Sequence, residues 1–188
     1  LNRWLVGQSQ IKGHITTLSS LILKSQSAYI FHIGDTRIYR LRDGALECLT
    51  QDHCTRINKQ TTYLSRAMGM DSHLEVDFQT QDTQLNDLYF LSTDGIHDYL
   101  TEKEIHTHLM TCQDLEKQAS FDDTCQQLID QALEAGSTDN LSCQIIRIDT
   151  LPGADNQEIY KKMYALKFPP ILESGQRIDG YQVIKEIH

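Results

Sequence analysis

The chain has 188 residues, of which 39% are hydrophobic and 23% charged, with a formal net charge of −9. This length and composition predict a soluble globular protein with one medium-sized domain and some additional chain. The acidic balance argues against binding to nucleic acid or anionic membranes, because their phosphate groups attract basic patches. We expect no membrane-spanning segment, since no apolar run approaches the roughly 18 residues required, and no signal peptide.

The five cysteines are odd in number and contain no Cys-x-x-Cys pair, which argues against a disulfide framework or a zinc cluster. A reducing, cytoplasmic compartment is therefore expected. The first residue is Leu1 rather than Met, and Leu1, Trp4 and Leu5 have helical spacing. The chain is thus expected to begin inside a helix, as a piece of something longer.

A β-meander is predicted for the first fifty residues. Residues 16–23 and 28–33 are rich in strand-forming residues and read as a hairpin. Residues 36–41 form a half-exposed pattern, and Asp43-Gly44 is a strong hairpin signal before a partner strand at 45–49.

The next forty residues mix weak and strong signals. Residues 64–69 predict a helical turn that ends at Gly69. Residues 74–78 alternate between apolar and polar types, which predicts a strand with one wet face. Residues 88–91 have the length and bulk of a buried strand, and Ser-Thr-Asp-Gly follows them.

Two helices and a last strand are predicted next. Thr101 to Glu104 is a capping box that opens one helix. Residues 121–133 carry one apolar stripe, with Ser120 as the expected N-cap and Gly136 as the stop. Residues 141–148 alternate as a final strand.

Two aspartates flank the predicted strands: Asp94 follows one and Asp139 precedes the other. If these strands are neighbours, both carboxylates lie at one edge of a sheet. Clustered carboxylates are hard oxygen donors that select Mg²⁺ or Mn²⁺, and two such ions can support phosphoester hydrolysis. The alternative is two unrelated turn aspartates, with Asp94 capping the residues after it.

Other candidate residues have less support. His106 and His108 are two apart on a helix and point to different faces. His53 could pair with Asp52, although turns contain many such neighbours. No Gly-x-Ser-x-Gly elbow or phosphate-binding Gly-rich loop is present, so a serine hydrolase or P-loop protein is not indicated.

Five short motifs follow one another along the chain. They are Thr16-Thr17-Leu18, Gly34-Asp35-Thr36-Arg37 with Tyr39, Leu49-Thr50-Gln51-Asp52-His53, Ser92-Thr93-Asp94-Gly95 and Asp139-Asn140-Leu141-Ser142. In this order they resemble the metal-dependent protein phosphatases of type 2C (PPM). The resemblance covers about residues 13–149. It implies an α+β fold, an α-β-β-α sandwich of two antiparallel sheets flanked by helices, and removal of phosphate from phosphoserine and phosphothreonine in proteins.

The resemblance also implies site residues. In the family, the Asp of Thr-Asp-Gly and the Asp of Asp-Asn bind a centre of two Mg²⁺ or Mn²⁺ ions, which carries over to Asp94 and Asp139. The Asp of Asp-His binds a third, weaker ion in many members, which carries over to Asp52. Asp35 belongs to a structural turn, and a buried hydrogen-bonding role is expected for it. No substrate-binding residue is identified.

The sequence departs from the family pattern in two ways. The first metal-binding motif, Asp-Gly-x-Gly-Gly, and the earlier Arg that meets the substrate phosphate are absent, and so the N-terminal strands are expected to be missing. The chain as given should therefore bind metal poorly and catalyse little. The segment that resembles the family's flap, about residues 54–65, is short, so substrate selection is expected to differ.

The last forty residues differ in composition from the rest. Prolines punctuate residues 150–177, which predicts a linker after a partial phosphatase-like domain at 1–149. Residues 178–188 resemble the approach to the Gly-rich loop of a protein kinase, as in bacterial phosphatase–kinase proteins, although an arbitrary strand is the alternative. The expected function is metal-dependent dephosphorylation of a phosphorylated protein within a phosphatase–kinase signalling protein. The alternative is a non-catalytic module that binds phosphoproteins or regulates a fused kinase.

Overall fold

The computed structural model describes residues 1–12, 14–58, 61–113, 121–153, 160, 163–164, 174–178, 181–182 and 184–185. These residues divide into two compact units, Leu1–Gly153 and Ala154–His188. The first unit contains all of the predicted site residues.

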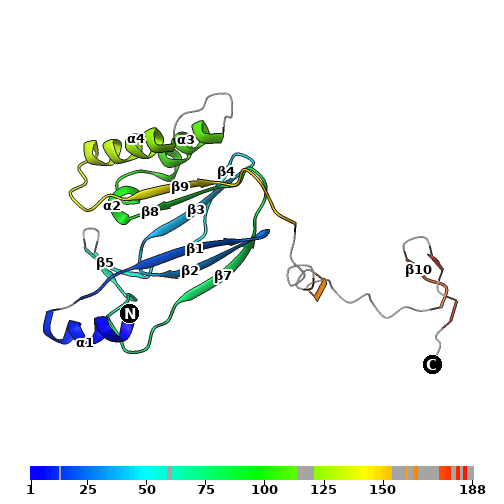
Figure 1. Cartoon of the computed structure of the whole chain (residues 1–188), viewed down its shortest axis with the longest axis horizontal. Helices are drawn as coiled ribbons and strands as arrows, with labels where there is room; N and C mark the ends of the chain where they lie inside the picture. Colours follow the sequence, from blue (N-terminus) through cyan, green and yellow to red (C-terminus); the bar gives the residue numbers. More distant parts are fainter. Residues whose placement is uncertain are drawn as a thin grey trace. The chain divides into compact units, whose positions relative to one another are not determined.

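Two antiparallel sheets form the centre of the first unit (Figure 1). One has the strand order β1-β2-β7 and the other β4-β3-β8-β9. Their bounds are β1 Leu18–Lys24, β2 Ser27–Ile33, β7 Asp77–Asp82, β4 Ala45–Cys48, β3 Arg37–Arg42, β8 Leu88–Ser92 and β9 Cys143–Arg147. A separate hairpin pairs β5 (Cys54–Asn58) with β6 (Thr61–Leu64).

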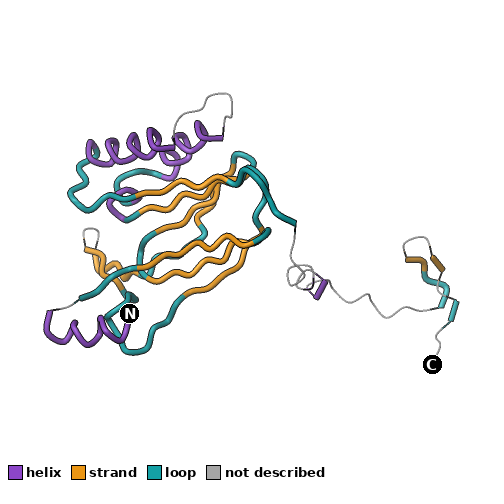
Figure 2. The backbone as a smooth tube through the Cα atoms, viewed as in Figure 1, coloured by secondary structure: helices purple, strands orange, loops and turns teal. Residues whose placement is uncertain are grey.

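Helices lie over the outer face of one sheet and at one end of the other (Figure 2). Three of them, α2 (Asp94–His97), α3 (Glu102–Gln113) and α4 (Phe121–Glu134), lie over the four-stranded sheet, while α1 (Asn2–Lys12) packs at one end of the other sheet through Leu5. The layers confirm the predicted sandwich of two antiparallel sheets flanked by helices.

The predicted meander is present with the expected turns. Asp43 and Gly44 have φ values of 49° and 76°, which the tight turn between β3 and β4 requires. Ser25 has a φ of 52° in the turn between β1 and β2. The Cα register pairs Leu18 with Ile33 at the open end of that hairpin.

Two local predictions were wrong. Residues 64–69 form no helical turn, because Leu64 ends β6 and Met68 forms a β-bridge with Thr16 instead. The strand predicted at 74–78 runs over Asp77–Asp82, because pairing with β2, which places Phe78 beside Phe31, determines where its ladder lies. Pairing with a distant strand thus overrode the local alternation.

The capping box of α3 forms as predicted. The backbone N–H of Thr101 donates to Glu104 Oε2 at 2.8 Å, and the Glu104 N–H donates to Thr101 Oγ1 at 3.3 Å. Helix α4 ends before Gly136, whose φ is 95°. The predicted N-cap of α4, Ser120, lies outside the described residues.

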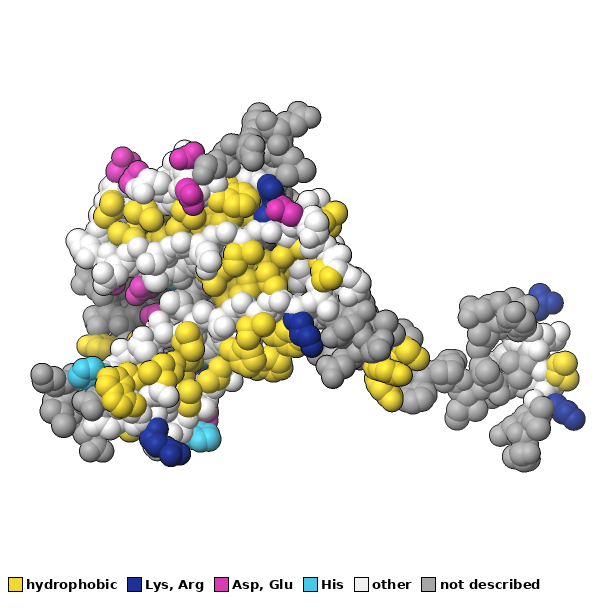
Figure 3. Space-filling view, in the orientation of Figure 1, with side chains coloured by type: hydrophobic (Ala, Val, Ile, Leu, Met, Phe, Trp, Pro, Cys, Tyr) yellow, Lys and Arg dark blue, Asp and Glu magenta, His cyan; other side chains and the backbone are white. Residues whose placement is uncertain are grey.

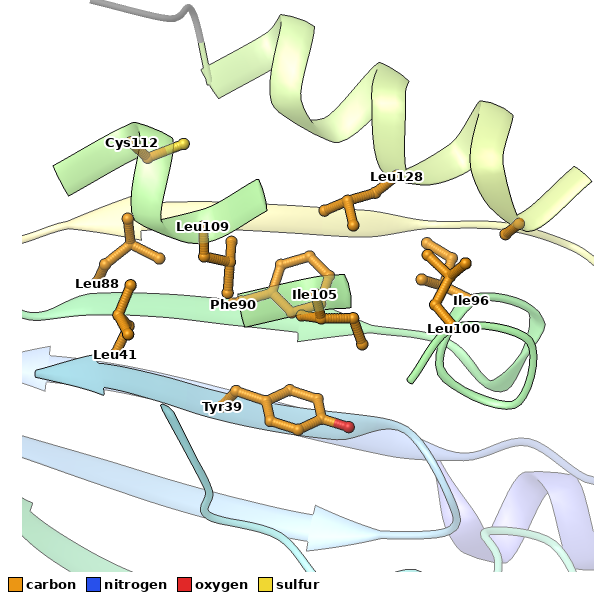
Figure 4. Close-up of a cluster of buried hydrophobic side chains, with 11 residues drawn as sticks. Tyr39, Leu41, Leu88, Phe90, Ile96, Leu100, Ile105, Leu109, Cys112 and Leu128 are labelled. Carbon is orange, nitrogen blue, oxygen red and sulfur yellow. The ribbon is translucent and has the colours of Figure 1, made fainter. Parts of the chain in front are cut away.

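Two apolar layers hold the domain together. Side chains of β3, β8 and the helices form the larger cluster, which includes Tyr39, Phe90, Ile105 and Leu128 (Figure 4). A second cluster, around Tyr89, lies between the two sheets. Figure 3 shows further hydrophobic side chains on the face that carries the edge strands β1 and β9.

The second unit contains a short hairpin, in which β10 (Arg177–Ile178) pairs with β11 (Tyr181–Gln182). Most of the linker predicted at 150–177 and part of the kinase-like stretch predicted at 178–188 lie outside the described residues. Both assignments stay predictions. Among the described helices, none has the length and hydropathy needed to cross a membrane.

Replacing Leu128 tests the larger cluster. Leu128 is fully buried, so Leu128→Ala should leave a cavity and lower the free energy of unfolding by about 2–5 kcal/mol. Leu133→Ala on the same helix is the matched control, because Leu133 is 50% exposed, and its expected cost is about 0.5 kcal/mol. Urea denaturation of the full chain measures both, and equal costs would contradict the assignment of this core.

Candidate functional site

The pairing of β8 with β9 brings the two flanking aspartates to one edge of the sheet. The strands are antiparallel neighbours, with Ser92 opposite Cys143. Beyond this pair, the Thr93 N–H donates to the Ser142 carbonyl at 3.0 Å. Asp94 follows β8 and Asp139 precedes β9, so the two segments that carry these aspartates lie at the same edge of the sheet, as expected.

Gly95 allows the two segments to approach closely. A Cβ at this position would lie 2.7 Å from the Asn140 carbonyl oxygen and 3.4 Å from Asp139 Cβ. The Gly95 N–H donates to Asp94 Oδ1 at 2.9 Å, and the Asn140 N–H donates to Asp139 Oδ1 at 2.7 Å. Each carboxylate is therefore oriented by the backbone of the next residue.

Asp94 lies in an acidic cleft of about 670 Å³. Its lining residues come from the turn before β3, the start of β3, the loop before β5, the β5–β6 hairpin, α2 and the residue after α2; they are Asp35, Arg37, Asp52, Cys54, Tyr63, Leu64, Asp94, His97 and Asp98. Asp139 is exposed and is not among them.

Asp35 is a cleft residue that the sequence interpretation assigned to structure alone. It lines the cleft and is half-buried. Burial, and then the neighbouring carboxylate of Asp94, raise the pKa of Asp35 above its ordinary value. A Gly-Asp turn has no local feature that predicts a shared cleft with Asp94, which is 59 positions away, so only the fold could reveal this neighbourhood.

Asp52 lies in the cleft bound to an arginine. Arg37 Nε donates to Asp52 Oδ1 at 2.9 Å and to Oδ2 at 3.2 Å, and Nη2 donates to Oδ2 at 2.7 Å. Burial acts to raise the pKa of Asp52, but the hydrogen bonds and charge of Arg37 outweigh it and lower that pKa. Asp52 is thus an ion-pair partner in this structure.

His97 is a buried cleft residue that the sequence interpretation missed. Its side chain is 6% exposed, and Nδ1 lies 2.9 Å from Ser92 Oγ. Nε2 has no hydrogen-bond partner among the described residues, although the nearby backbone of Asp35 acts to raise the ring's pKa. Burial and then the charge of Arg37 lower the pKa of His97 to about 4, so the ring is neutral at neutral pH.

Three further histidines, His53, His106 and His108, have structural partners. The Gly34 N–H donates to His53 Nδ1 at 3.1 Å, which leaves Nε2 to donate to Asp77 at 2.9 Å. His53 therefore does not pair with Asp52. His106 and His108 contact different partners, the Gly44 carbonyl and Gln131, as expected from their two-residue spacing.

The donor set suits a hard cation only in part. Within the described residues, no group of three or more His, Cys, Asp or Glu side chains is arranged to hold a metal ion. Asp94 and Asp139 together fit an ion of the Mg²⁺ type, which is commonly held by one or two carboxylates with water and phosphate. Asp52 does not fit as a ligand in this arrangement, since Arg37 engages both its oxygens. The assignment of all three aspartates as ligands stays a prediction.

The buried His97 makes a testable contribution to acid sensitivity. As the pH falls, a histidine in the unfolded chain takes up a proton near pH 6.5, but folded His97 does so only near pH 4. Between these two values the unfolded state binds more protons, so the free energy of unfolding decreases as the pH is lowered from 6.5 to 4. The loss is roughly 3 kcal/mol, at about 1.4 kcal/mol per pKa unit. Urea denaturation measured at pH values from 7.5 to 4 tests this. On acidification, the free energy of unfolding of His97→Gln should fall by less than that of the unmodified chain, and the difference should equal this amount.

A control separates this effect from the loss of any histidine. His73→Gln removes an exposed histidine and should leave the pH profile unchanged. Identical profiles for His97→Gln and the unmodified chain would show that burial of His97 does not shift its titration.

Known proteins share this architecture. The serine/threonine phosphatase stp of Listeria monocytogenes serovar 1/2a is 27% identical over 164 residues, which cover 79% of this chain and 63% of that protein. The structure of the Mycobacterium tuberculosis serine/threonine phosphatase PstP/Ppp matches with 25% identity and a TM-score of 0.65, covering 78% of this chain and 67% of that one. The catalytic domain of PstP in complex with two manganese ions matches in fold, with 24% identity, a TM-score of 0.64 and coverage of 78% and 66%.

The match to a family extends over most of the chain. The family model for protein phosphatase 2C matches residues 2–145. The chain spans only 61–63% of the length of the curated relatives from Streptococcus pyogenes and Listeria monocytogenes. The extent of the family match confirms the resemblance, and the chain belongs to the protein phosphatase 2C family.

Proposed function

We propose that the chain takes part in metal-dependent hydrolysis of phosphoserine and phosphothreonine in proteins. The observation that supports this proposal is the β8–β9 register, which brings the turn that follows β8 with Asp94 close to the turn that precedes β9 with Asp139. Asp94 also lines the acidic cleft. Family membership supports the same reaction class. Because the chain spans less than two thirds of its curated relatives, the activity of the whole protein is part of this proposal.

The charge of the cleft explains why a metal would be needed. Four aspartates line it, against one arginine and a neutral histidine. A phosphate monoester is itself anionic, so the cleft would repel it unless divalent cations were bound. Asp94 and Asp139 are the residues that would hold such a cation, and Mg²⁺ or Mn²⁺ would supply charge neutralisation and an activated water.

The chain's own groups would orient this site. The backbone N–H groups of Gly95 and Asn140 hold one oxygen of each carboxylate, leaving the other for a cation. Cys54 and Tyr63 of the β5–β6 hairpin line the same cleft, and we assign this short hairpin to substrate contact. The PstP complex with two manganese ions supports the choice of metal.

Turnover by the chain tests this function. The unmodified chain should hydrolyse a phosphothreonine peptide slowly and only with Mn²⁺ or Mg²⁺, as measured by phosphate release. Asp94→Asn and Asp139→Asn should each reduce the rate at least about tenfold, because each removes a charge that binds the cation. Asp123→Asn is the control, since Asp123 is exposed on α4. An unchanged rate in both site variants would reject the assignment.

A non-catalytic role is the second candidate. The absence of a three-ligand metal group among the described residues favours it. Such a module would bind a phosphoprotein or regulate a partner without turnover. Phosphopeptide binding in calorimetry, with no phosphate release in any metal, would select this role over catalysis.

The C-terminal unit supports a further proposal about partners. The β10–β11 hairpin overlaps the stretch at 178–188 that resembles the start of a kinase, and we propose a fused kinase domain as the partner of the phosphatase-like domain. A cytoplasmic location is proposed on the cysteine pattern: the described structure contains five free cysteines.

A further inference from the structure

The Asp52 carboxylate is held as one half of a bidentate ion pair. Three contacts of 2.7–3.2 Å join it to the Nε and Nη2 atoms of Arg37. The third guanidinium nitrogen, Nη1, donates to the Tyr39 hydroxyl at 3.2 Å. Every nitrogen of Arg37 is therefore engaged inside the domain, and the Asp52 oxygens face a fixed cation.

Backbone contacts hold both partners of this pair in place. The Leu49 N–H donates to the Ile38 carbonyl at 2.7 Å, and the Ile38 N–H donates to Thr50 Oγ1 at 3.1 Å. On the other side, the His53 N–H donates to the Gly34 carbonyl at 2.7 Å. The loop that carries Asp52 is thus bonded to the β3 region both before and after Asp52. The backbone of this loop is already ordered, so the ion pair forms with little further loss of backbone conformational entropy.

Arg37 also dominates the charge balance of the cleft. It is the one arginine or lysine among the residues that line the cleft, where four aspartates gather. Its guanidinium stays charged at every working pH, and its side chain is 24% exposed, so water screens the pair only partly. A permanent cation therefore lies beside Asp52 in the cleft.

We propose that Arg37 is the built-in cation of the Asp52 side of the cleft and that Asp52 positions Arg37 instead of ligating a metal ion. Metal ions would then bind only at the Asp94–Asp139 end, so the proposed phosphatase reaction would need no third ion. This inference rests on the proposed function for the site at Asp94, but its test does not require turnover.

Binding of Mn²⁺ alone to the full chain tests the inference by calorimetry and by electron paramagnetic resonance of free Mn²⁺. Asp52→Asn should leave the number and affinity of bound ions unchanged within about twofold, whereas Asp94→Asn should weaken binding at least about tenfold. Arg37→Leu should add one weaker Mn²⁺ site, because it leaves four carboxylates without a cation. The double variant Arg37→Leu/Asp52→Asn should lose that added site.

Arg40→Leu is the matched control. Arg40 lies on the same strand and forms a 2.6 Å ion pair with Glu47, away from the cleft, so its loss should add no Mn²⁺ site. If Arg37→Leu unfolds the chain, as circular dichroism would show, Arg37→Lys replaces it. A lysine keeps the charge but not the bidentate contact, and a smaller gain in Mn²⁺ binding is expected.

The possible results separate the two proposals. Loss of Mn²⁺ binding in Asp52→Asn comparable to that in Asp94→Asn would overturn the role given to Arg37, as would a folded Arg37→Leu variant without an added site. If the unmodified chain binds no Mn²⁺, the metal-dependent function fails. The comparison of Arg37→Leu with its double variant still decides the role of Arg37 in that case.

Discussion

The close approach of Gly95 to Asn140 is the contact on which the candidate site depends. Any side chain at position 95 would place a Cβ 2.7 Å from the Asn140 carbonyl oxygen, so the turn after β8 and the turn before β9 would have to move apart. The buried bond from Ser137 Oγ to the Gly95 carbonyl, at 2.8 Å, fastens the same turn from the other side. Contacts of the backbone around Gly95 therefore shape this site without a bound ion.

The cleft combines opposite demands of stability and chemistry. Burial, and then repulsion from the neighbouring carboxylate of Asp94, raise the pKa of Asp35, and four carboxylates in one cleft favour a bound cation. Arg37 relieves this repulsion at Asp52 but leaves Asp94 without a basic partner among the described residues. The buried His97, which also lines the cleft, is neutral and adds no positive charge at neutral pH.

Much of the architecture could be predicted because its signals are local. The buried strand at 88–91, the Asp43-Gly44 turn and the capping box at Thr101 are each encoded within a few residues. The β5–β6 hairpin and the true extent of β7 could not be predicted in this way. The two strands of the hairpin pair with each other, but their segment is polar and shows no clear alternation. The partner of β7 is the distant strand β2, and a half-buried strand takes its register from the strand beside it.

The sequence by itself determined the family, through five ordered motifs, and the identity of the aspartates that end and begin two strands. The tertiary structure alone decided which of them meet. Ser92 and Cys143 are 51 positions apart, yet their pairing brings the segments that carry Asp94 and Asp139 to one edge of the sheet. The tertiary fold also pairs Asp52 with Arg37 and brings Asp35 into the cleft. The partners of a carboxylate depend on how distant segments pack together, and a local sequence pattern does not contain that information.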